Sequence, residues 1–400
     1  MRNIIKAIAI LALVNCSRPL TVSSVRGHDA GTGSDIIPGI VDAGTAAIVM
    51  QTSVGSVHSC ALAFAGTVHC WGDNQYGQLG DFTTGTSYTP TTVYKLADAV
   101  QISSGSEHTC AVRADGNVVC WGNGQFGQLG DGLGFTNNIP VAVVGLPPAR
   151  SVSCGDERSC AITRDGALYC WGMNADNLLG TGTNGNTPVP TIVSGLNGAK
   201  VTDVAVNATH VCAVLDGGFV TCWGSGQYGA LGNGSEEDSD RPGGIVLSGV
   251  AQIAVGYRHS CAALSDGTVN CWGWNNCGVL GIEGNGEKDS PVAVATLSNI
   301  AAISVSDFNS CTLANDGTVA CWGENSYGKL GNGTTERSLL PTFVSGNNQT
   351  AFVSVGENHS CAALTDGRVV CWGINQYGQL GNGGNEYSAV PVNVIWPPPS

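Results

Sequence analysis

Short apolar runs that alternate with polar residues dominate the chain from about residue 45 onward, and Gly, Asn, Asp and Pro separate them. Runs of this kind, with no helical period, predict β-strands joined by tight turns. The pattern returns about every fifty residues. Each block holds four such runs: one before a Val-Gly pair, one through a first cysteine, one through a Cys-Trp-Gly triplet and one after a proline.

The Cys-Trp-Gly triplet occurs seven times, at intervals of 50, 50, 52, 49, 50 and 50 residues. A fixed period near fifty residues is typical of propellers and solenoids. Closure into a ring protects the sheet edges that a linear stack leaves open. We therefore predict an all-β fold, a seven-bladed β-propeller with four antiparallel strands per blade.

A second cysteine precedes each triplet by ten residues; a glycine lies between the two in all seven copies, and in five of them it ends an x-Asp-Gly turn. A three-residue loop that ends in a left-handed glycine closes a tight hairpin. In the last copy the loop is Thr365–Gly367, which places Cys361 directly opposite Cys371. Opposed residues in a non-hydrogen-bonded pair approach closely enough for a disulfide.

A metal site is the alternative for these cysteines, because a histidine often lies two residues before the first one and a His-x-Cys…Cys trio suits zinc. However, Arg158 and Asn309 replace the histidine in two copies, whereas both cysteines occur in all seven. Paired cysteines in an exported chain favour disulfides. We predict one intrablade disulfide per blade, no metal and no cofactor, with the pairs Cys60–Cys70, Cys110–Cys120, Cys160–Cys170, Cys212–Cys222, Cys261–Cys271, Cys311–Cys321 and Cys361–Cys371.

Other recurring positions have structural interpretations. The histidine is expected to form a local hydrogen bond in the loop between the first two strands, rather than to join an axial ligand-binding ring. The position of Asn74 holds Asn or Gly, which we assign to a left-handed turn. The tryptophans should pack between blades, with sugar stacking as the alternative if they are exposed; they are Trp71, Trp121, Trp171, Trp223, Trp272, Trp322 and Trp372.

The first sixteen residues carry Arg2 and Lys6 before a short apolar run, which predicts an export signal. The sequence "LVNC" resembles a lipoprotein box that would lipidate Cys16, but Asn15 departs from it, so both lipidation and ordinary secretion remain open. We expect a tether over 17–45, the propeller over 46–395 and a Pro-rich tail over 396–400. The segment "IIPGIV" (36–41) either adds a strand to the last blade or belongs to the tether.

Two cysteines of the repeat region fall outside the pairs. Cys154 replaces residues such as Val54, and Cys277 replaces aromatic residues such as Tyr76. They lie in blades three and five, which are not neighbours. We therefore expect two unpaired buried thiols.

The net charge of −14 disfavours nucleic acid and anionic membranes as partners. No Gly-x-Ser-x-Gly, His-Glu-x-x-His or phosphate-loop pattern suggests catalysis, and the recurrent Asp-Gly aspartates are assigned to turns. Two equivalent loops of adjacent blades are acidic, and they form either a solvated rim or a weak candidate for a calcium site or a contact for a basic partner. The carboxylates are Glu236, Glu237, Asp238, Asp240, Glu283, Glu287 and Asp289.

The unit V-G-x-x-H-S-C-A-L-x-x-D-G-x-V-x-C-W-G-x-N-x-x-G-Q-L-G, followed by P-x-x-V, resembles the regulator of chromosome condensation repeat over residues 45 to 395. The resemblance implies a seven-bladed propeller but not one function, because fold does not fix function. The best-known member exchanges guanine nucleotide on a nuclear small GTPase and binds chromatin. A secreted bacterial inhibitor of β-lactamase with this architecture binds a protein through one propeller face.

The export signal, the acidic charge and the regular spacing, which leaves little room for an inserted wedge, depart from the nucleotide-exchange member. Our leading hypothesis is a monomeric, non-enzymatic propeller in the envelope or outside the cell. It would bind a protein, or in second place a glycan, through the loops of one face, with a membrane contact only through a lipid anchor. The alternatives are a regulator of a small GTPase and an enzyme with an axial active site.

Overall fold

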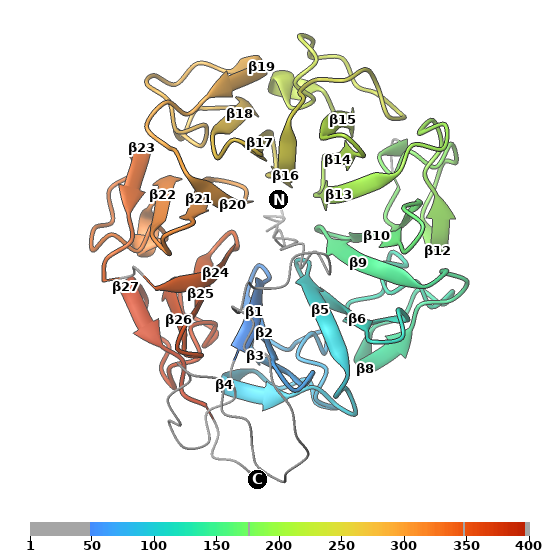
Figure 1. Ribbon diagram of the computed structural model, residues 1–400. Coiled ribbons are helices and arrows are strands. Elements are labelled where there is room, and N and C mark those ends of the chain that lie inside the picture. Colours follow the sequence, from blue (N-terminus) through green and yellow to red (C-terminus); the bar gives the residue numbers. More distant parts are fainter. Residues whose placement is uncertain (1–48, 175–176, 347–348, 397–400) are drawn as a thin grey trace, which may run out of the picture.

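The computed structural model describes residues 49–174, 177–346 and 349–396. Seven β-sheets stand around a central axis as the blades of a propeller, and each blade runs in sequence order from its innermost strand outward (Figure 1). Six sheets have four antiparallel strands, and the fourth blade has three. The predicted fold class, with a disulfide in every blade, is confirmed.

The strands of the first four blades are β1 (Val49–Val54), β2 (His58–Ala63), β3 (Val68–Gly72) and β4 (Ser87–Thr92); β5 (Ala99–Ser104), β6 (His108–Arg113), β7 (Val118–Gly122) and β8 (Asn137–Ala142); β9 (Ala149–Cys154), β10 (Arg158–Thr163), β11 (Leu168–Gly172) and β12 (Thr187–Ile192); and β13 (Val201–Val206), β14 (His210–Leu215) and β15 (Phe219–Gly224). The strands of the last three blades are β16 (Val250–Val255), β17 (His259–Leu264), β18 (Val269–Gly273) and β19 (Lys288–Ala293); β20 (Ile300–Val305), β21 (Asn309–Ala314), β22 (Val319–Gly323) and β23 (Ser338–Phe343); and β24 (Thr350–Val355), β25 (His359–Leu364), β26 (Val369–Gly373) and β27 (Ser388–Asn393). Two short 3-10 turns are η2 (Gln227–Gly229) and η3 (Ser326–Gly328).

The outer strands differ from the expectation in one detail. The proline that recurs in the repeat lies inside the outer strand, as Pro90 does in β4, rather than before it. An outer strand tolerates proline because its free edge needs no N–H donor. In the fourth blade two isolated bridges, Val220↔Leu247 and Gly224↔Ser239, replace the outer strand.

The central hairpin has the predicted register. Cys361 faces Cys371, Ala362 faces Val370, and Gly367 closes the turn at φ +86°. The turn aspartate also accepts a bond, since Asp366 Oδ1 lies 3.0 Å from the Arg368 amide nitrogen. In all seven blades the paired cysteines have Cα atoms 4.0 or 4.1 Å apart, and the predicted disulfides form.

Among the residues that the structure describes, no strand is exchanged between the ends of the ring: β27 is the outer strand of the seventh blade and β1 the inner strand of the first. Side chains join the two blades instead. The Ser59 hydroxyl contacts His359 Nε2 at 2.6 Å, and Trp71 Nε1 donates to the carbonyl of residue 379 at 2.9 Å. Segment 36–41, the signal and Cys16 lie outside the described residues.

We predict that a chain beginning at residue 46 keeps the stability of the complete protein, because the described residues close the ring by themselves. Its melting temperature should fall by less than about 2 °C, which corresponds to a small free-energy change for a chain of this size. Differential scanning calorimetry with oxidised disulfides measures this shift. A drop of many degrees, or selective proteolysis of the first and last blades, would assign ring closure to the removed segment.

Candidate functional site

A layer of tryptophans lies between the blades. All seven repeat tryptophans are fully buried. Six of them donate Nε1–H to a main-chain carbonyl of the preceding blade at 2.8–2.9 Å, as Trp121 does to residue 78. The glycine of Gln-Leu-Gly makes room for the ring: a Cβ on Gly80 would lie 2.7 Å from Trp121 Nε1, and its φ of +68° also suits glycine. These buried rings are therefore unavailable for stacking on sugars.

The repeat histidine bonds across the blade boundary, so the prediction of a local bond within its own loop is wrong. His58 Nε2 lies 2.9 Å from the Thr109 hydroxyl of the next blade. The loop glycine donates its amide to the His58 carbonyl at 2.8 Å and also makes room for the ring, because a methyl group on Gly55 would overlap the His58 ring. The other four equivalent contacts span 2.6–3.2 Å and join His108–Ser159, His210–Ser260, His259–Ser310 and His359–Ser59.

The hydroxyl in each contact fixes the histidine tautomer. Ser159 donates its one proton to the carbonyl of residue 128 at 2.9 Å, the same carbonyl that accepts Trp171 Nε1–H. His108 must therefore donate through Nε2–H to the Ser159 oxygen. Burial lowers the pKa of all five rings, to about 4 for His210 and about 3 for the other four, with smaller repulsion from a neighbouring histidine in three cases. At neutral pH these five rings, which we call the histidine belt, are therefore uncharged.

Two blade boundaries lack this histidine contact. Arg158 donates to the carbonyls of Met173 and Ala208 at 2.8 and 2.5 Å, and Val211 stands where other blades carry the hydroxyl. At the same boundary Trp223 Nε1 has no acceptor among the described residues. Asn309 instead accepts a hydrogen bond from Ser306 within its own blade.

We predict that acid destabilises the protein through these histidines. Their pKa is lowered in the fold, so below about pH 6.5 the unfolded chain binds more protons and stability falls toward pH 3. Each histidine contributes about 1.4 kcal/mol per pH unit to this slope. His259→Asn, which copies the natural Asn309, should cost about 1–3 kcal/mol at pH 7. Its denaturant midpoint should nevertheless fall less steeply between pH 6.5 and 4.5. An unchanged slope would contradict the neutral buried state of His259.

A second belt, which was not predicted from the sequence, joins the innermost strands near the axis. The Gln51 carboxamide accepts from the Ile102 amide at 3.1 Å and donates to the Ile102 carbonyl at 3.0 Å. Gln101 and Gln252 repeat the amide contact to the next blade. Asp203 occupies the same repeat position, and its carboxylate accepts from the amides of Val204 and Ile253 at 3.0 and 2.9 Å.

Asp203 is the strongly perturbed carboxylate that an axial active site would need. Burial raises its pKa to about 7, opposed by the amides of Ile253 and Val204 and by Arg150. Both of its oxygens already accept backbone amides, and three other blades use glutamine for the same contact. Asp203 is therefore a structural group of the inner belt.

We predict that Asp203→Gln stabilises the protein in mild alkali. A raised pKa means that the folded state holds a proton that the unfolded state releases, so the wild type loses stability as the pH rises from about 4 to 7. Glutamine restores the contact found in other blades without a charge. The variant should gain stability at pH 8, and the gain should shrink as the pH falls below 7. A variant that is equally destabilised at both pH values would show that the carboxylate itself is required.

The two faces of the propeller differ in what they carry. The face formed by the loops that precede the histidine positions and follow Cys-Trp-Gly is called the histidine-loop face. The opposite face, formed by the β2–β3 type hairpin turns and the links between blades, is called the hairpin-turn face. β1 begins and β27 ends on the hairpin-turn face, as strand direction requires.

An aromatic cluster lies on the histidine-loop face of blades four to six. The Arg258 guanidinium stands 4.7 Å from the Tyr228 ring centroid and 4.8 Å from that of Tyr257. The Trp274 and Phe308 rings meet edge to face at 6.0 Å, and the Trp274 amide donates to the Arg258 carbonyl at 2.8 Å. All five side chains are half-buried. Sequence comparison missed the cluster because Arg258, Tyr257, Trp274 and Phe308 occur at variable loop positions, although Tyr228 occupies the recurring aromatic position of Tyr76.

The same face is acidic over blades one to three. Burial raises the pKa of Glu107, the hydrogen bond from Asn123 lowers it, and the charges of Asp156 and Asp73 raise it again. These carboxylates therefore lie close enough to repel one another. The histidine-loop face therefore carries these carboxylates over blades one to three, and the arginine–aromatic cluster over blades four to six, where the acidic loops of blades four and five also lie.

The predicted acidic loops are adjacent, since the Gly234 amide donates to the Asp289 carbonyl at 2.9 Å. Asp238 is engaged within its own loop and accepts from the Gly226 amide at 2.8 Å. Among the described residues, no three carboxylates of this rim converge as metal ligands, and a cation site there stays a prediction.

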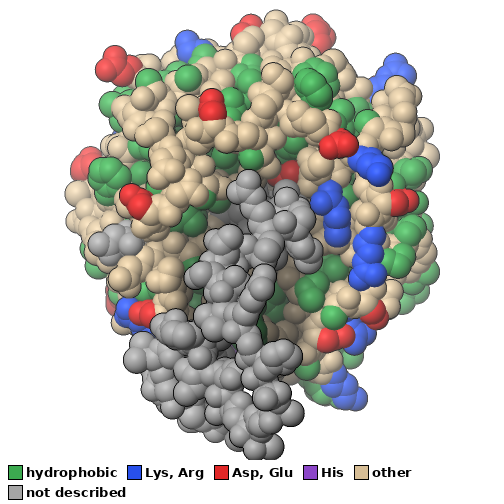
Figure 2. All heavy atoms as spheres, in the orientation of Figure 1, with side chains coloured by type: hydrophobic (Ala, Val, Ile, Leu, Met, Phe, Trp, Pro, Cys, Tyr) green, Lys and Arg blue, Asp and Glu red, His purple; other side chains and the backbone are tan. Residues whose placement is uncertain are grey.

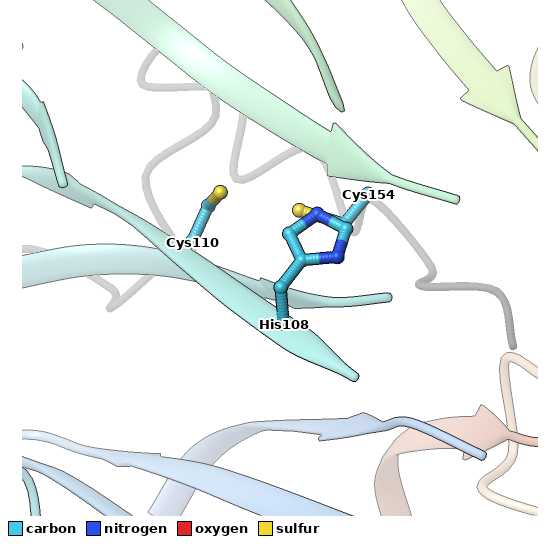
Figure 3. A group of neighbouring side chains, drawn as sticks. All are labelled: His108, Cys110 and Cys154. Atoms are coloured by element: carbon cyan, nitrogen blue, oxygen red, sulfur yellow. The ribbon is translucent and has the colours of Figure 1, made fainter. Parts of the chain in front are cut away.

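One trio among the described residues has ligand-like spacing: His108, Cys110 and Cys154, with atoms within 4.8 Å of one another (Figure 3). The Cys110 sulfur is bonded to Cys120, so it offers no thiolate to a metal. Cys154 is a free and fully buried thiol, as predicted. Cys277 is also free but half-buried, because its repeat position is a partly exposed aromatic site in other blades.

Charge on the face in view in Figure 2 is dispersed, with Lys and Arg mainly along the side that blades two to four occupy in Figure 1. Among the basic residues at hairpin turns and blade links, Arg113 pairs with Asp98 at 2.9 Å, and Arg164 donates to the Ala114 carbonyl at 3.2 Å. A carboxylate therefore balances the charge of Arg113, whereas Arg164 is held by a neutral main-chain group. No helix of the described residues is long and apolar enough to cross a membrane.

These features define a disulfide-stapled seven-bladed propeller with a variable loop face. A family model described as RCC1-like domain matches residues 148–398, and models of the regulator of chromosome condensation (RCC1) repeat match 51–78, 99–128, 65–112 and 115–162. The chain belongs to the RCC1 repeat family.

Solved structures show the same fold. Human WBSCR16 is 24% identical with a TM-score of 0.68, covering 74% of this chain and 81% of that one. Prp20p from Saccharomyces cerevisiae is 22% identical with a TM-score of 0.74, covering 84% and 87%. Yeast RCC1 (Prp20) in complex with Kap60 is 22% identical with a TM-score of 0.73, covering 94% and 91%.

Proposed function

We propose that this protein is an exported binding propeller whose histidine-loop face docks a protein partner. Seven disulfides support an oxidising compartment outside the cytosol, whether the envelope or the extracellular space. Any tether or lipid anchor before Val49 joins the hairpin-turn face, where β1 begins. The histidine-loop face then points away from the attachment and is free for a partner.

The Arg258 cluster is the observation that carries the proposal. No carboxylate among the described residues pairs with Arg258, and its guanidinium is held between two tyrosine rings. Cation–π contacts of this kind hold the guanidinium in place before binding. Arginine, tyrosine and tryptophan dominate the hot spots of protein interfaces. The cluster therefore suits a partner segment with an acidic side chain flanked by apolar residues.

The carboxylates over blades one to three would contribute to how the partner is oriented. Glu107 and its neighbouring carboxylates would repel the acidic segment that Arg258 attracts, and they would attract basic residues. Complementary charge of this kind contributes to orientation and association rate more than to affinity. A partner with an acidic and a basic patch would bind in one orientation.

The two other candidate functions have weaker support. A glycan role depended on exposed repeat tryptophans, and those rings are buried. A role as regulator of a small GTPase follows from Prp20p, which was characterised with its binding to Gsp1p and histones, but the 22% identity carries over the fold alone. A regulator of a cytosolic GTPase would also lie in a reducing compartment, where these cysteines would stay unpaired. Binding rather than catalysis is the role that we assign.

We predict that Arg258→Ala weakens partner binding at least tenfold, about 1.4 kcal/mol, because a buried charge-assisted contact is lost. The bait is the complete oxidised protein, and partners are captured from envelope and secreted fractions and then titrated by calorimetry. The matched control is Arg164→Ala on the hairpin-turn face, which should leave the Kd unchanged. Loss of binding in the Arg164 variant alone would place the site on the opposite face. Turnover in a substrate screen without any specific partner would overturn the binding function.

A further inference from the structure

Cys154 occupies a repeat position that touches the disulfide of the preceding blade. The residue that ends each inner strand is valine in five blades, Ser104 in the second and Cys154 in the third. Cys110 and Cys154 belong to the same buried cluster, as Cys160 and Val206 do at the next boundary. The repeat therefore places a thiol where most blades place an inert side chain.

The Cys154 sulfur faces this disulfide at short range. It lies within 4.8 Å of the Cys110 sulfur, and the His108 ring is in the same pocket (Figure 3). The Ser159 hydroxyl is 3.9 Å from Cys154 Sγ and 3.8 Å from Cys110 Sγ. The Cys154 amide is held by Ser103 Oγ at 2.8 Å, which fixes the backbone that carries the thiol.

We propose that Cys154 exchanges with the Cys110–Cys120 disulfide and thereby forms a covalent link between blades two and three. The Cys154 thiolate attacks Cys110 Sγ, the Cys110–Cys120 bond breaks, and a Cys110–Cys154 bond forms. Cys120 leaves as a thiolate and takes up the proton that Cys154 released. One disulfide replaces another, so no external oxidant or reductant is consumed.

The exchange is slow in the closed ring. Burial raises the pKa of Cys154 to about 12, with smaller opposing effects from Ser103, Ser159 and Cys110, and the thiolate is the reactive form. Alkaline pH or transient opening of the boundary between blades two and three raises the reactive fraction. The interblade disulfide then holds the two blades together after such an opening, which a hairpin disulfide cannot do.

The direct test uses Cys120→Ser, which leaves Cys110 without its partner. In the secreted full-length variant, non-reducing peptide mass spectrometry should find Cys110 bonded to Cys154. The matched control is Cys170→Ser, which frees Cys160 beside Val206; here no interblade bond should form. A folded Cys120→Ser protein in which Cys110 and Cys154 both remain free thiols would overturn the proposal.

A second test needs no loss of a disulfide partner and holds if Cys120→Ser fails to fold. Wild-type protein is incubated at pH 7 and pH 9 with N-ethylmaleimide and then mapped. Label should accumulate on Cys120 faster at pH 9 and be absent there in Cys154→Val, while Cys277 reacts alike in both proteins. Label on Cys154 without label on Cys120 would show that the thiol is exposed but does not exchange.

Discussion

One side-chain hydroxyl at six of the seven blade boundaries organises most of the ring. The Ser159 oxygen accepts Nε2–H from His108 and donates to the same carbonyl that accepts Trp171 Nε1–H. Three polar groups of one boundary thus satisfy one another inside a layer of buried tryptophan, leucine and valine. This pairing stabilises the layer, because an unpaired buried donor costs about 1–3 kcal/mol. The same contact joins the last blade to the first.

Much of this architecture could be predicted from the sequence because it repeats. Comparison of the seven copies predicted the hairpin turn, the opposed cysteines and the number of blades. The hydrogen-bond partners of single side chains could not be predicted. The spacing of the histidine suggested a bond within its own loop, yet His58 Nε2 bonds to a hydroxyl of the next blade. The prediction of a left-handed turn at the Asn74 position was wrong for a related reason. Its backbone is not left-handed; its amide oxygen accepts from the Leu79 amide at 3.0 Å, a contact made by the side chain.

The informative residues are those at which one copy departs from the others. Arg158 departs together with Val211, so a charged residue bonds to main-chain carbonyls where the hydroxyl is missing. Asp203 replaces the glutamine of other blades. It keeps the contact to an amide of the next blade but buries a carboxylate. Arg258 lies half-buried at a loop position that varies between the copies, and no carboxylate of the described residues pairs with it. Departures in the belts are structural, whereas the departure on the loop face is the one that a partner can use.

The central claim is that neutral histidines donate across blade boundaries through Nε2–H. Selective nitrogen-15 labelling of histidine, followed by long-range nitrogen–proton correlation spectroscopy at pH 5 to 7, measures the tautomer and charge of each ring. The account predicts that His58, His108, His210, His259 and His359 remain neutral Nε2–H tautomers throughout that range. Imidazolium shifts at pH 5 in folded protein, or Nδ1–H tautomers, would contradict it.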